Sequence, residues 1–299
     1  MTDGAFALVL VCHAPLYAVG DTHTRPEDKL LSYAAHSFVP ILGKLFALRD
    51  EGIPAQVTLA ISPLLAHQLS APTFASRFQA YLEARLAAAQ RDMRYYSGEV
   101  VDWHPHSALY APSAAPVNHT VQREPDAHQQ YLAQWHYNNL QEVAYTFNEV
   151  CGADLIRALR DLQDSADVEL MTTAATHAYL PLLATDAAVH AQIQGAVMMH
   201  ERLFGRRPTS FYLPALAYRP AMQRADGTLR ESLASALRAH GIKVFLAETH
   251  LIRGGALACA PGGKLRDVQG NMARRYTFPQ AHTLPPRDAS PLVPHAIKD

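Results

Sequence analysis

Several side chains that could do chemistry stand directly after apolar runs typical of buried strands. His13 follows AFALVLVC, His177 and Tyr179 follow VELMTTAA, and Glu248 and His250 end the segment KVFLAETH. Carboxyl groups can act as nucleophiles or as general acids and bases, and imidazole rings can move protons, bind hydroxyl groups or hold metals. These positions are therefore the first candidates for a functional site.

Three of these candidates are histidines, and three imidazoles with one open position would suit a catalytic zinc ion. His13, His177 and His250 are far apart in the sequence, however, and no short HxxxH pair accompanies them. The spacing is therefore a weak signal for a metal. We expect no metal and no cofactor.

The elements that must position these residues alternate between strand-like and helix-like patterns. Such alternation is typical of parallel βα units, and in barrels of this kind the chemistry lies at the carboxyl ends of the strands. This adds Ala215 and Tyr218, which follow a strand-like segment, to the candidates. The sequence predicts an α/β protein with a parallel barrel or part of one. Strands are expected at residues 5–12, 56–62, 168–175, 210–214 and 243–248, and helices around 38–46, 63–96, 126–150, 153–163, 185–205 and 229–240.

Two segments lack this periodicity. Residues 98–125 carry four prolines and read as a long loop inserted over one face. Residues 254–299 contain six prolines and five glycines and show no strong strand pattern. We therefore expect a barrel region over residues 1–253, with 98–125 as its insertion, and an irregular segment over 254–299.

The composition excludes several classes of protein. The chain has 299 residues, 49% of them apolar and 18% charged, with 26 basic and 27 acidic residues well mixed. The sequence shows no basic stripe of the kind that binds nucleic acid, so nucleic-acid binding is not expected. No stretch approaches the roughly 20 apolar residues needed to span a membrane. The three cysteines, at unpatterned spacings, argue against a disulfide framework. A cytoplasmic protein is expected.

Five segments together resemble the glycoside hydrolases of family 57, specifically the α-1,4-glucan branching-enzyme group. They keep that group's order and spacing from Ala7 to about Leu251. The segments are LVLVCHAPLY (8–17), DLIRALRDLQ (154–163), VELMTTAATHAYLPLL (168–183), FYLPALAYRP (211–220) and GIKVFLAETHL (241–251).

The resemblance implies a (β/α)7-type barrel acting on α-1,4-glucans with retention of configuration. Such chemistry uses a nucleophilic carboxylate and an acid/base carboxyl group about 5–5.5 Å apart. Carrying the motif over places Ala215 at the nucleophile, and a methyl group cannot attack an anomeric carbon. The family's second carboxylate lies on a later strand, beyond Asp299. The resemblance therefore implies a barrel that is incomplete or open and a protein that lacks both catalytic carboxylates.

The resemblance also implies that the remaining side chains at the strand ends bind sugar. The same histidines could equally be hydrogen-bonded barrel residues, and the tyrosines could serve packing alone. The implied sugar-binding set is His13, His177, Tyr179, Tyr212, Tyr218 and His250.

Three functions stay open from the sequence. The first is a catalytically inactive protein of α-glucan metabolism that binds α-1,4-glucan or maltooligosaccharide. The second is an active branching or α-glucanase-type enzyme that uses a substitute carboxylate such as Glu248. The third is a structural half-barrel or truncated gene product, whose open edge a homodimer partner or a second chain would cover, since five strands are too few to close such a barrel.

Overall fold

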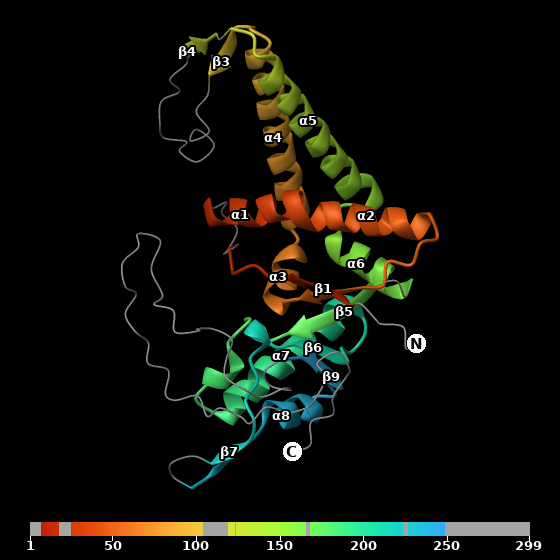
Figure 1. Cartoon of the computed structure of the whole chain (residues 1–299), viewed down its shortest axis with the longest axis vertical. Coiled ribbons are helices and arrows are strands. Elements are labelled where there is room, and N and C mark those ends of the chain that lie inside the picture. The colour runs from red at the N-terminus through yellow and green to blue at the C-terminus, as the bar shows by residue number, and fades with distance from the viewer. Residues whose placement is uncertain are drawn as a thin grey trace, which may run out of the picture. The chain divides into compact units, whose positions relative to one another are not determined.

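A computed structural model describes residues 7–17, 25–103, 119–122, 124–165, 168–223 and 227–248 (Figure 1). The chain forms two compact units. The first unit comprises Met1–His177 and Gly195–Pro208, and the second comprises Ala178–Gln194 and Thr209–Asp299. The predicted boundary between residues 253 and 254 lies outside the described residues.

All five predicted strands form, although each is shorter than the sequence suggested. They are β1 (Leu8–Cys12), β2 (Val57–Ile61), β5 (Val168–Thr173), β6 (Ser210–Tyr212) and β9 (Val244–Leu246). Their order is β1-β2-β5-β6-β9, and the register is parallel for β1 with β2, β2 with β5 and β6 with β9. Within the described part of the chain, β1 and β9 are edge strands, so the sheet is open there.

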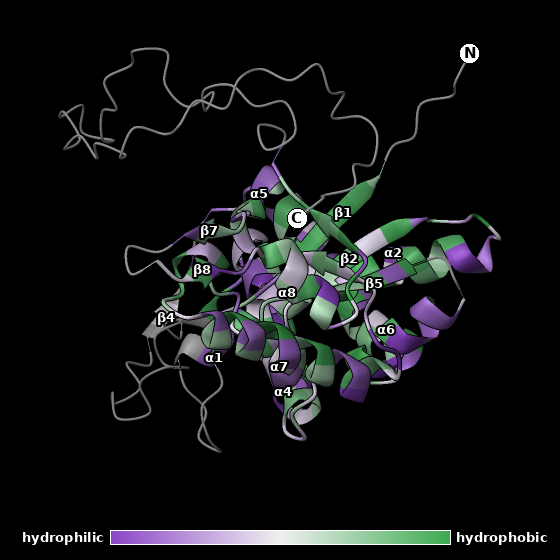
Figure 2. Ribbon diagram, turned by 90° about the horizontal axis from the view of Figure 1, so that it is seen from below, coloured by the Kyte–Doolittle hydropathy of each residue, from purple (hydrophilic) through white to green (hydrophobic). Residues whose placement is uncertain are grey.

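Helices of the first unit cover its three strands. The core joins apolar residues of these helices, among them Leu31, Leu42 and Leu159, to Leu59 and Leu170 of the strands. The strands β1, β2 and β5 are largely hydrophobic, as Figure 2 shows, which suits strands covered by helices. The helices are α1 (Arg25–Tyr33), the π-helical turn η1 (Ala34–Phe38), α2 (Val39–Asp50), α3 (Pro63–Leu69) and α6 (Leu155–Asp164).

A long helical hairpin is inserted between β2 and β5. It pairs α4 (Phe74–Tyr96) with α5 (Ala127–Tyr145), which ends in the π-helical turn η3 (Thr146–Val150) (Figure 1). At its base Phe78 and Phe147, both fully buried, make an edge-to-face contact with ring centroids 4.7 Å apart. The ends of the predicted 98–125 loop form an antiparallel pair, β3 (Val101–Trp103) with β4 (His119–Val121), and residues 104–118 lie outside the described ranges.

The second unit packs its elements around the start of α7 (Asp186–Phe204). Asp186, in the first turn of this helix, accepts a hydrogen bond from the backbone N–H of Glu231 at 3.2 Å and lies 3.3 Å from Arg230 Nε. An acidic side chain there also suits the helix dipole. The remaining elements are the 3₁₀ turns η4 (Leu180–Leu182) and η5 (Pro214–Leu216), the strand pair β7 (Met222–Gln223) with β8 (Leu229–Arg230), and α8 (Leu233–Ala239).

Two helix predictions were wrong at their boundaries. The single helix expected over residues 63–96 is divided into α3 and α4, because Pro72 disfavours helical geometry in the residue before it. The helix expected from Leu229 begins only at Leu233, because Ser232 caps it by accepting a hydrogen bond from the N–H of Ser235 at 3.0 Å. Leu229 belongs instead to β8.

The sequence analysis also missed one long apolar helical run. Residues Glu27–Asp50 are long and apolar enough to cross a membrane by length and composition alone. Yet Leu30, Leu31, Ala35 and Val39 of this run are at most 1% exposed and belong to the core cluster of the first unit. The apolar character is therefore accounted for by packing in the core.

Candidate functional site

Two of the predicted histidines meet in the first unit. His13 follows β1 and His177 follows β5, so each stands at the carboxyl end of its strand. Their rings stack face to face, with centroids 4.1 Å apart and planes 15° apart. The structure thus brings together two candidates that are 164 positions apart in the sequence.

Hydroxyl groups hold both rings. His13 Nδ1 lies 2.9 Å from Ser62 Oγ, and the same oxygen accepts a hydrogen bond from the N–H of Leu65 at the start of α3. His177 Nδ1 lies 3.3 Å from Thr173 Oγ1, at the end of β5. The ring positions are therefore fixed by a helix cap and by a strand end, both rigid parts of the fold.

Both histidines favour their neutral form. Burial lowers the pKa of His13 below its ordinary value. Burial, and secondly the neighbouring His13, lower the pKa of His177 to about 4. A neutral imidazole presents one N–H donor and one nitrogen acceptor. At neutral pH the pair is therefore suited to uncharged hydroxyl groups rather than to an anion.

The second unit carries the position where the resemblance places a nucleophile. Ala215 is exposed after β6, within η5, and has a left-handed backbone with φ 56° and ψ 22°. The next residue, Leu216, is also left-handed, with φ 54°. Backbone N–H groups hold the turn, with Leu216 donating to the Leu213 carbonyl at 2.7 Å. At the position where the resemblance places the nucleophile, the turn thus displays a methyl group.

The other candidates of the second unit are dispersed over its elements. Tyr218 stacks on Phe245 of β9, with centroids 5.7 Å apart and planes 9° apart, which is a packing contact. Tyr212 is half-buried in β6, while Tyr179 is 47% exposed before η4. Glu248 is exposed just after β9. His250 lies outside the described residues.

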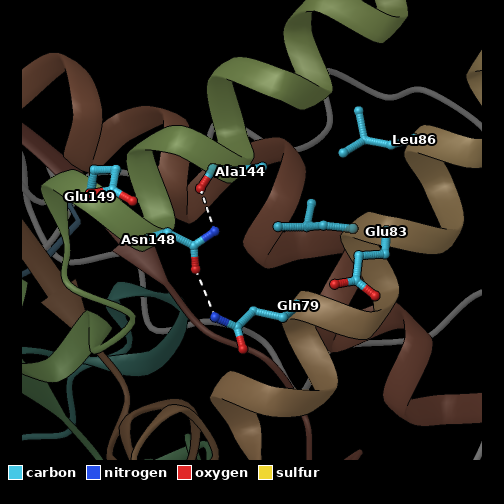
Figure 3. Close-up of a pocket in the computed structure, with 7 residues that line it drawn as sticks. Gln79, Glu83, Leu86, Ala144, Asn148 and Glu149 are labelled. Carbon is cyan, nitrogen blue, oxygen red and sulfur yellow. Dashed lines mark hydrogen bonds between the residues drawn. The ribbon is translucent and has the colours of Figure 1, made fainter.

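Within the described ranges, no group of three His, Cys, Asp or Glu side chains is arranged to hold a metal ion. A pocket of about 230 Å³ lies instead between α4 and the end of α5 (Figure 3). There Gln79 Nε2 donates to Asn148 Oδ1 at 2.8 Å, and Asn148 Nδ2 donates to the Ala144 carbonyl at 2.9 Å. This pocket is smaller than typical ligand pockets of about 300–1,000 Å³. It therefore carries no functional assignment.

Sequence reasoning missed the residues that support the candidates. Ser62 and Thr173 position the two histidines, and only the Ser-Pro start of a helix pattern hinted at the first. In the second unit Arg219 is buried, donates to the Glu231 carbonyl at 2.7 Å and lies 3.5 Å from Asp186 Oδ1. The sequence signal that could have identified Arg219 was its place in the AYRP motif.

Comparison with known proteins decides the family. Residues 71–295 match the sequence profile of glycosyl hydrolase family 57. The chain belongs to glycosyl hydrolase family 57. The predicted relationship is thereby confirmed.

Curated relatives of this family 57 chain are named as branching enzymes. The chain is 28% identical over 278 residues to a 1,4-alpha-glucan branching enzyme of Thermococcus kodakarensis, covering 91% of this chain and 37% of that protein. It is 26% identical over 230 residues to a probable 1,4-alpha-glucan branching enzyme of Mycobacterium tuberculosis, covering 74% and 39%. The chain thus spans about two fifths of the length of these relatives.

Solved structures agree on the fold. The family 57-type branching enzyme of Pyrococcus horikoshii is similar with a TM-score of 0.67 and 27% identity, over 83% of this chain and 42% of that one. The family 57 branching enzyme of Thermococcus kodakaraensis gives 0.66 and 26%, over 88% and 44%. The predicted α/β fold, an open barrel of the (β/α)7 type, is confirmed.

Proposed function

We propose that this family 57 protein binds α-1,4-glucan chains or maltooligosaccharides without cleaving or transferring them. The observation that carries the proposal is Ala215, exposed on a strained turn at the place where the resemblance puts the nucleophile. Retaining glycosidases form a covalent glycosyl-enzyme on that carboxylate. A methyl group offers no lone pair for the bond and no charge for the oxocarbenium-like transition state.

The binding half of the proposal rests on His13 and His177. Their stacked neutral rings offer hydrogen-bond donors and acceptors to uncharged hydroxyl groups at two strand ends. The relatives of similar sequence and fold are named for action on 1,4-alpha-glucan. A glucan is therefore the ligand class that fits both the chemistry of the pair and the family.

Calorimetry with maltoheptaose tests the binding. The protein should give saturable heat, and His177→Gly should remove it, because glycine keeps the backbone φ of 57° at this position while deleting the ring. His67→Ala, an exposed histidine on α3, is the matched control and should bind as the parent protein does. Absence of heat at millimolar maltoheptaose contradicts the proposal.

Incubation with amylose tests the inactivity. Iodine colour and reducing ends should stay unchanged. Turnover would favour the active-enzyme alternative, and a Glu248→Gln variant would then show whether the exposed carboxyl group after β9 substitutes for the missing one.

The edge strands β1 and β9, as far as the described residues show them, support a proposal on partners. Leu8 and Val11 of β1 are 41% and 44% exposed, and Val244 of β9 is 57% exposed. Exposed apolar edge strands invite pairing with another strand. We propose that a second copy or a second chain covers them, and sedimentation of a monomer over the micromolar range would contradict this.

For the location, we propose the cytoplasm. Cys12 and Cys151 are free thiols, which suits a reducing compartment, where disulfides are rare. Cell fractionation provides the check.

A further inference from the structure

A row of aromatic side chains lies exposed along α5, on the outside of the helical hairpin. Tyr131, Trp135 and Tyr145 are 66%, 59% and 63% exposed. With Asn138 and Glu142 they occupy positions spaced by four, three, four and three residues, which places them on one stripe of a helix. We call these five residues the α5 aromatic face.

The aromatic rings are not part of the packing that holds α5. The helix buries Ala133, Leu140 and Val143, which lie on its other side. The Tyr137 phenol, at the margin, accepts hydrogen bonds from Gln90 Nε2 of α4 and from Gln141 Nε2, at 3.0 and 3.1 Å. Packing within the hairpin accounts for the buried residues and for Tyr137. It does not explain why three large aromatic rings of the same helix are exposed.

The composition around the rings is unusual for a surface helix. From residue 127 to residue 141 there is no lysine, arginine, aspartate or glutamate, although charged residues make up 18% of the chain. The polar side chains of this stretch are mainly amides: Gln129, Gln130, Gln134, Asn138, Asn139 and Gln141. The carboxylate of Glu142, within the face, lies 3.0 Å from the ammonium group of Lys44. The face therefore presents rings and amides with little net charge.

This chemistry selects among possible occupants. A nucleic acid would require basic side chains, and the core of a protein interface would set aromatic rings among apolar side chains rather than among amides. Aromatic rings interleaved with amides match a neutral sugar chain, because pyranose rings have apolar faces for stacking and hydroxyl groups for the amides. The span from Tyr131 to Tyr145 is about 21 Å at the helical rise of about 1.5 Å per residue. That length accommodates several successive sugar rings.

We propose that the α5 aromatic face is a second glucan-binding surface, on a different element from the His13–His177 pair. It would hold a long α-1,4-glucan chain by stacking on Trp135 and its tyrosine neighbours. The choice of glucan among neutral polysaccharides rests on the proposed function; the surface itself is inferred from its own residues.

Tryptophan fluorescence tests this surface directly. The chain has two tryptophans, Trp103 and Trp135, so Trp103→Phe leaves Trp135, on α5, as the only tryptophan whose emission is followed. Addition of amylopectin, which supplies the long chains that the face is proposed to hold, should quench or shift the emission of this variant with a saturable dose response. The response should persist when His177→Gly is added, since that change removes the ring at the strand ends only.

A second measurement removes the rings. In native gels containing amylopectin, Trp135→Ser should weaken the apparent affinity for amylopectin about tenfold, the effect expected for loss of one central contact. The variant should therefore be retarded less than the parent protein. Leu132→Ser, at a 43% exposed apolar residue of the same helix, is the matched control and should migrate as the parent protein does. Trp135→Phe should keep most of the retardation.

The outcomes separate this inference from the proposed function. One set of results overturns the α5 surface and leaves the proposed function standing. In that set, glucan does not change the fluorescence of Trp103→Phe, Trp135→Ser is retarded as the parent protein is, and the calorimetric heat is lost in His177→Gly. Loss of both the heat and the fluorescence response overturns both. A change of the sedimentation coefficient in Trp135→Ser without added glucan would mean that a second copy of the chain occupies the face, which also overturns the inference.

Discussion

Ala215 combines an ordinary side chain with an unusual backbone. A left-handed conformation costs a residue with a Cβ atom about 1–2 kcal/mol, and Leu216 has the same conformation next to it. Strain of this kind persists where the surrounding structure imposes it, and it is concentrated at functional sites. The turn after β6 is therefore strained at the position where the resemblance places the nucleophile, and the side chain there is only a methyl group.

Replacing Ala215 by glycine should relieve this strain. We expect Ala215→Gly to raise the free energy of unfolding by about 0.5–1 kcal/mol, because glycine adopts φ 56° without penalty but loses more entropy on folding. Urea unfolding measures the change. Ala217→Gly is the control, since Ala217 has an extended backbone with φ −83° and should lose stability. A loss in Ala215→Gly as large as that in the control would contradict the account.

Sequence reasoning located the two histidines but not their contact. Each was expected at the end of a strand, since apolar runs and their ends are local properties of the chain. The stacking of His13 on His177 depends on β1 and β5 both pairing with β2, and on Ser62 and Thr173 setting each ring. Those relations join residues far apart in the sequence, which periodicity does not report.

At the scale of elements, the sequence periodicity likewise did not predict the π-helical turns, which depend on contacts between residues far apart in the chain. The sequence predicted helix through Val150, and helix is present, but η3 adds a residue to its turn at Thr146–Val150. This turn packs against α2, where Gly43 faces Thr146. The close approach explains a glycine inside a helix, where it otherwise costs about 1 kcal/mol relative to alanine.

Gly43→Ala should therefore destabilise the protein although alanine is the better helix former. A Cβ atom at position 43 would lie 2.9 Å from Thr146 Cγ2, closer than packed carbon atoms allow. We expect a loss of about 1–3 kcal/mol in urea unfolding. Thr146→Ser removes that methyl group, so the double variant should recover most of the loss.

The matched control is Gly195→Ala on α7. Its Cβ atom would meet only Ala175 Cβ at 3.4 Å, an ordinary contact, so this variant should be neutral or gain up to about 1 kcal/mol. Equal losses in both variants, or no recovery in the double variant, would contradict a steric origin at Gly43.

At the scale of the whole molecule, the order of the strands was accessible from the sequence. Once the insertion of α4, α5 and the strands between them is set aside, together with the separate strand pair β7–β8, the remaining strands stand in the sheet in the order of the chain. This follows from right-handed βα units, which place each new strand beside the last. The insertion itself was predicted only as a loop, because residues 98–125 carry prolines and little periodicity, whereas the long helices on either side have clear patterns.

Buried histidines should make the stability of the whole molecule depend on pH. Burial lowers the pKa of His200, which is 3% exposed, to about 4, and burial with the neighbouring His13 does the same for His177. In the unfolded chain these groups titrate near a pKa of about 6.5. Between these values the unfolded state binds more protons than the folded state, so stability falls as the pH drops from about 7 to about 4 and the loss is complete below that.

Urea unfolding at pH 7 and pH 5 measures this loss. His200 should contribute up to about 2 kcal/mol, and His177 less, because its ring is only partly buried and solvent screens its charge. His200→Asn and His177→Asn should each flatten the dependence of unfolding free energy on pH, and asparagine tolerates the left-handed backbone at position 177. If His177→Asn loses stability with acid as steeply as the parent protein, folding does not lower the pKa of His177, and the neutral His13–His177 pair proposed for sugar binding does not exist at pH 5. The same outcome for His200→Asn would contradict the account of His200 alone.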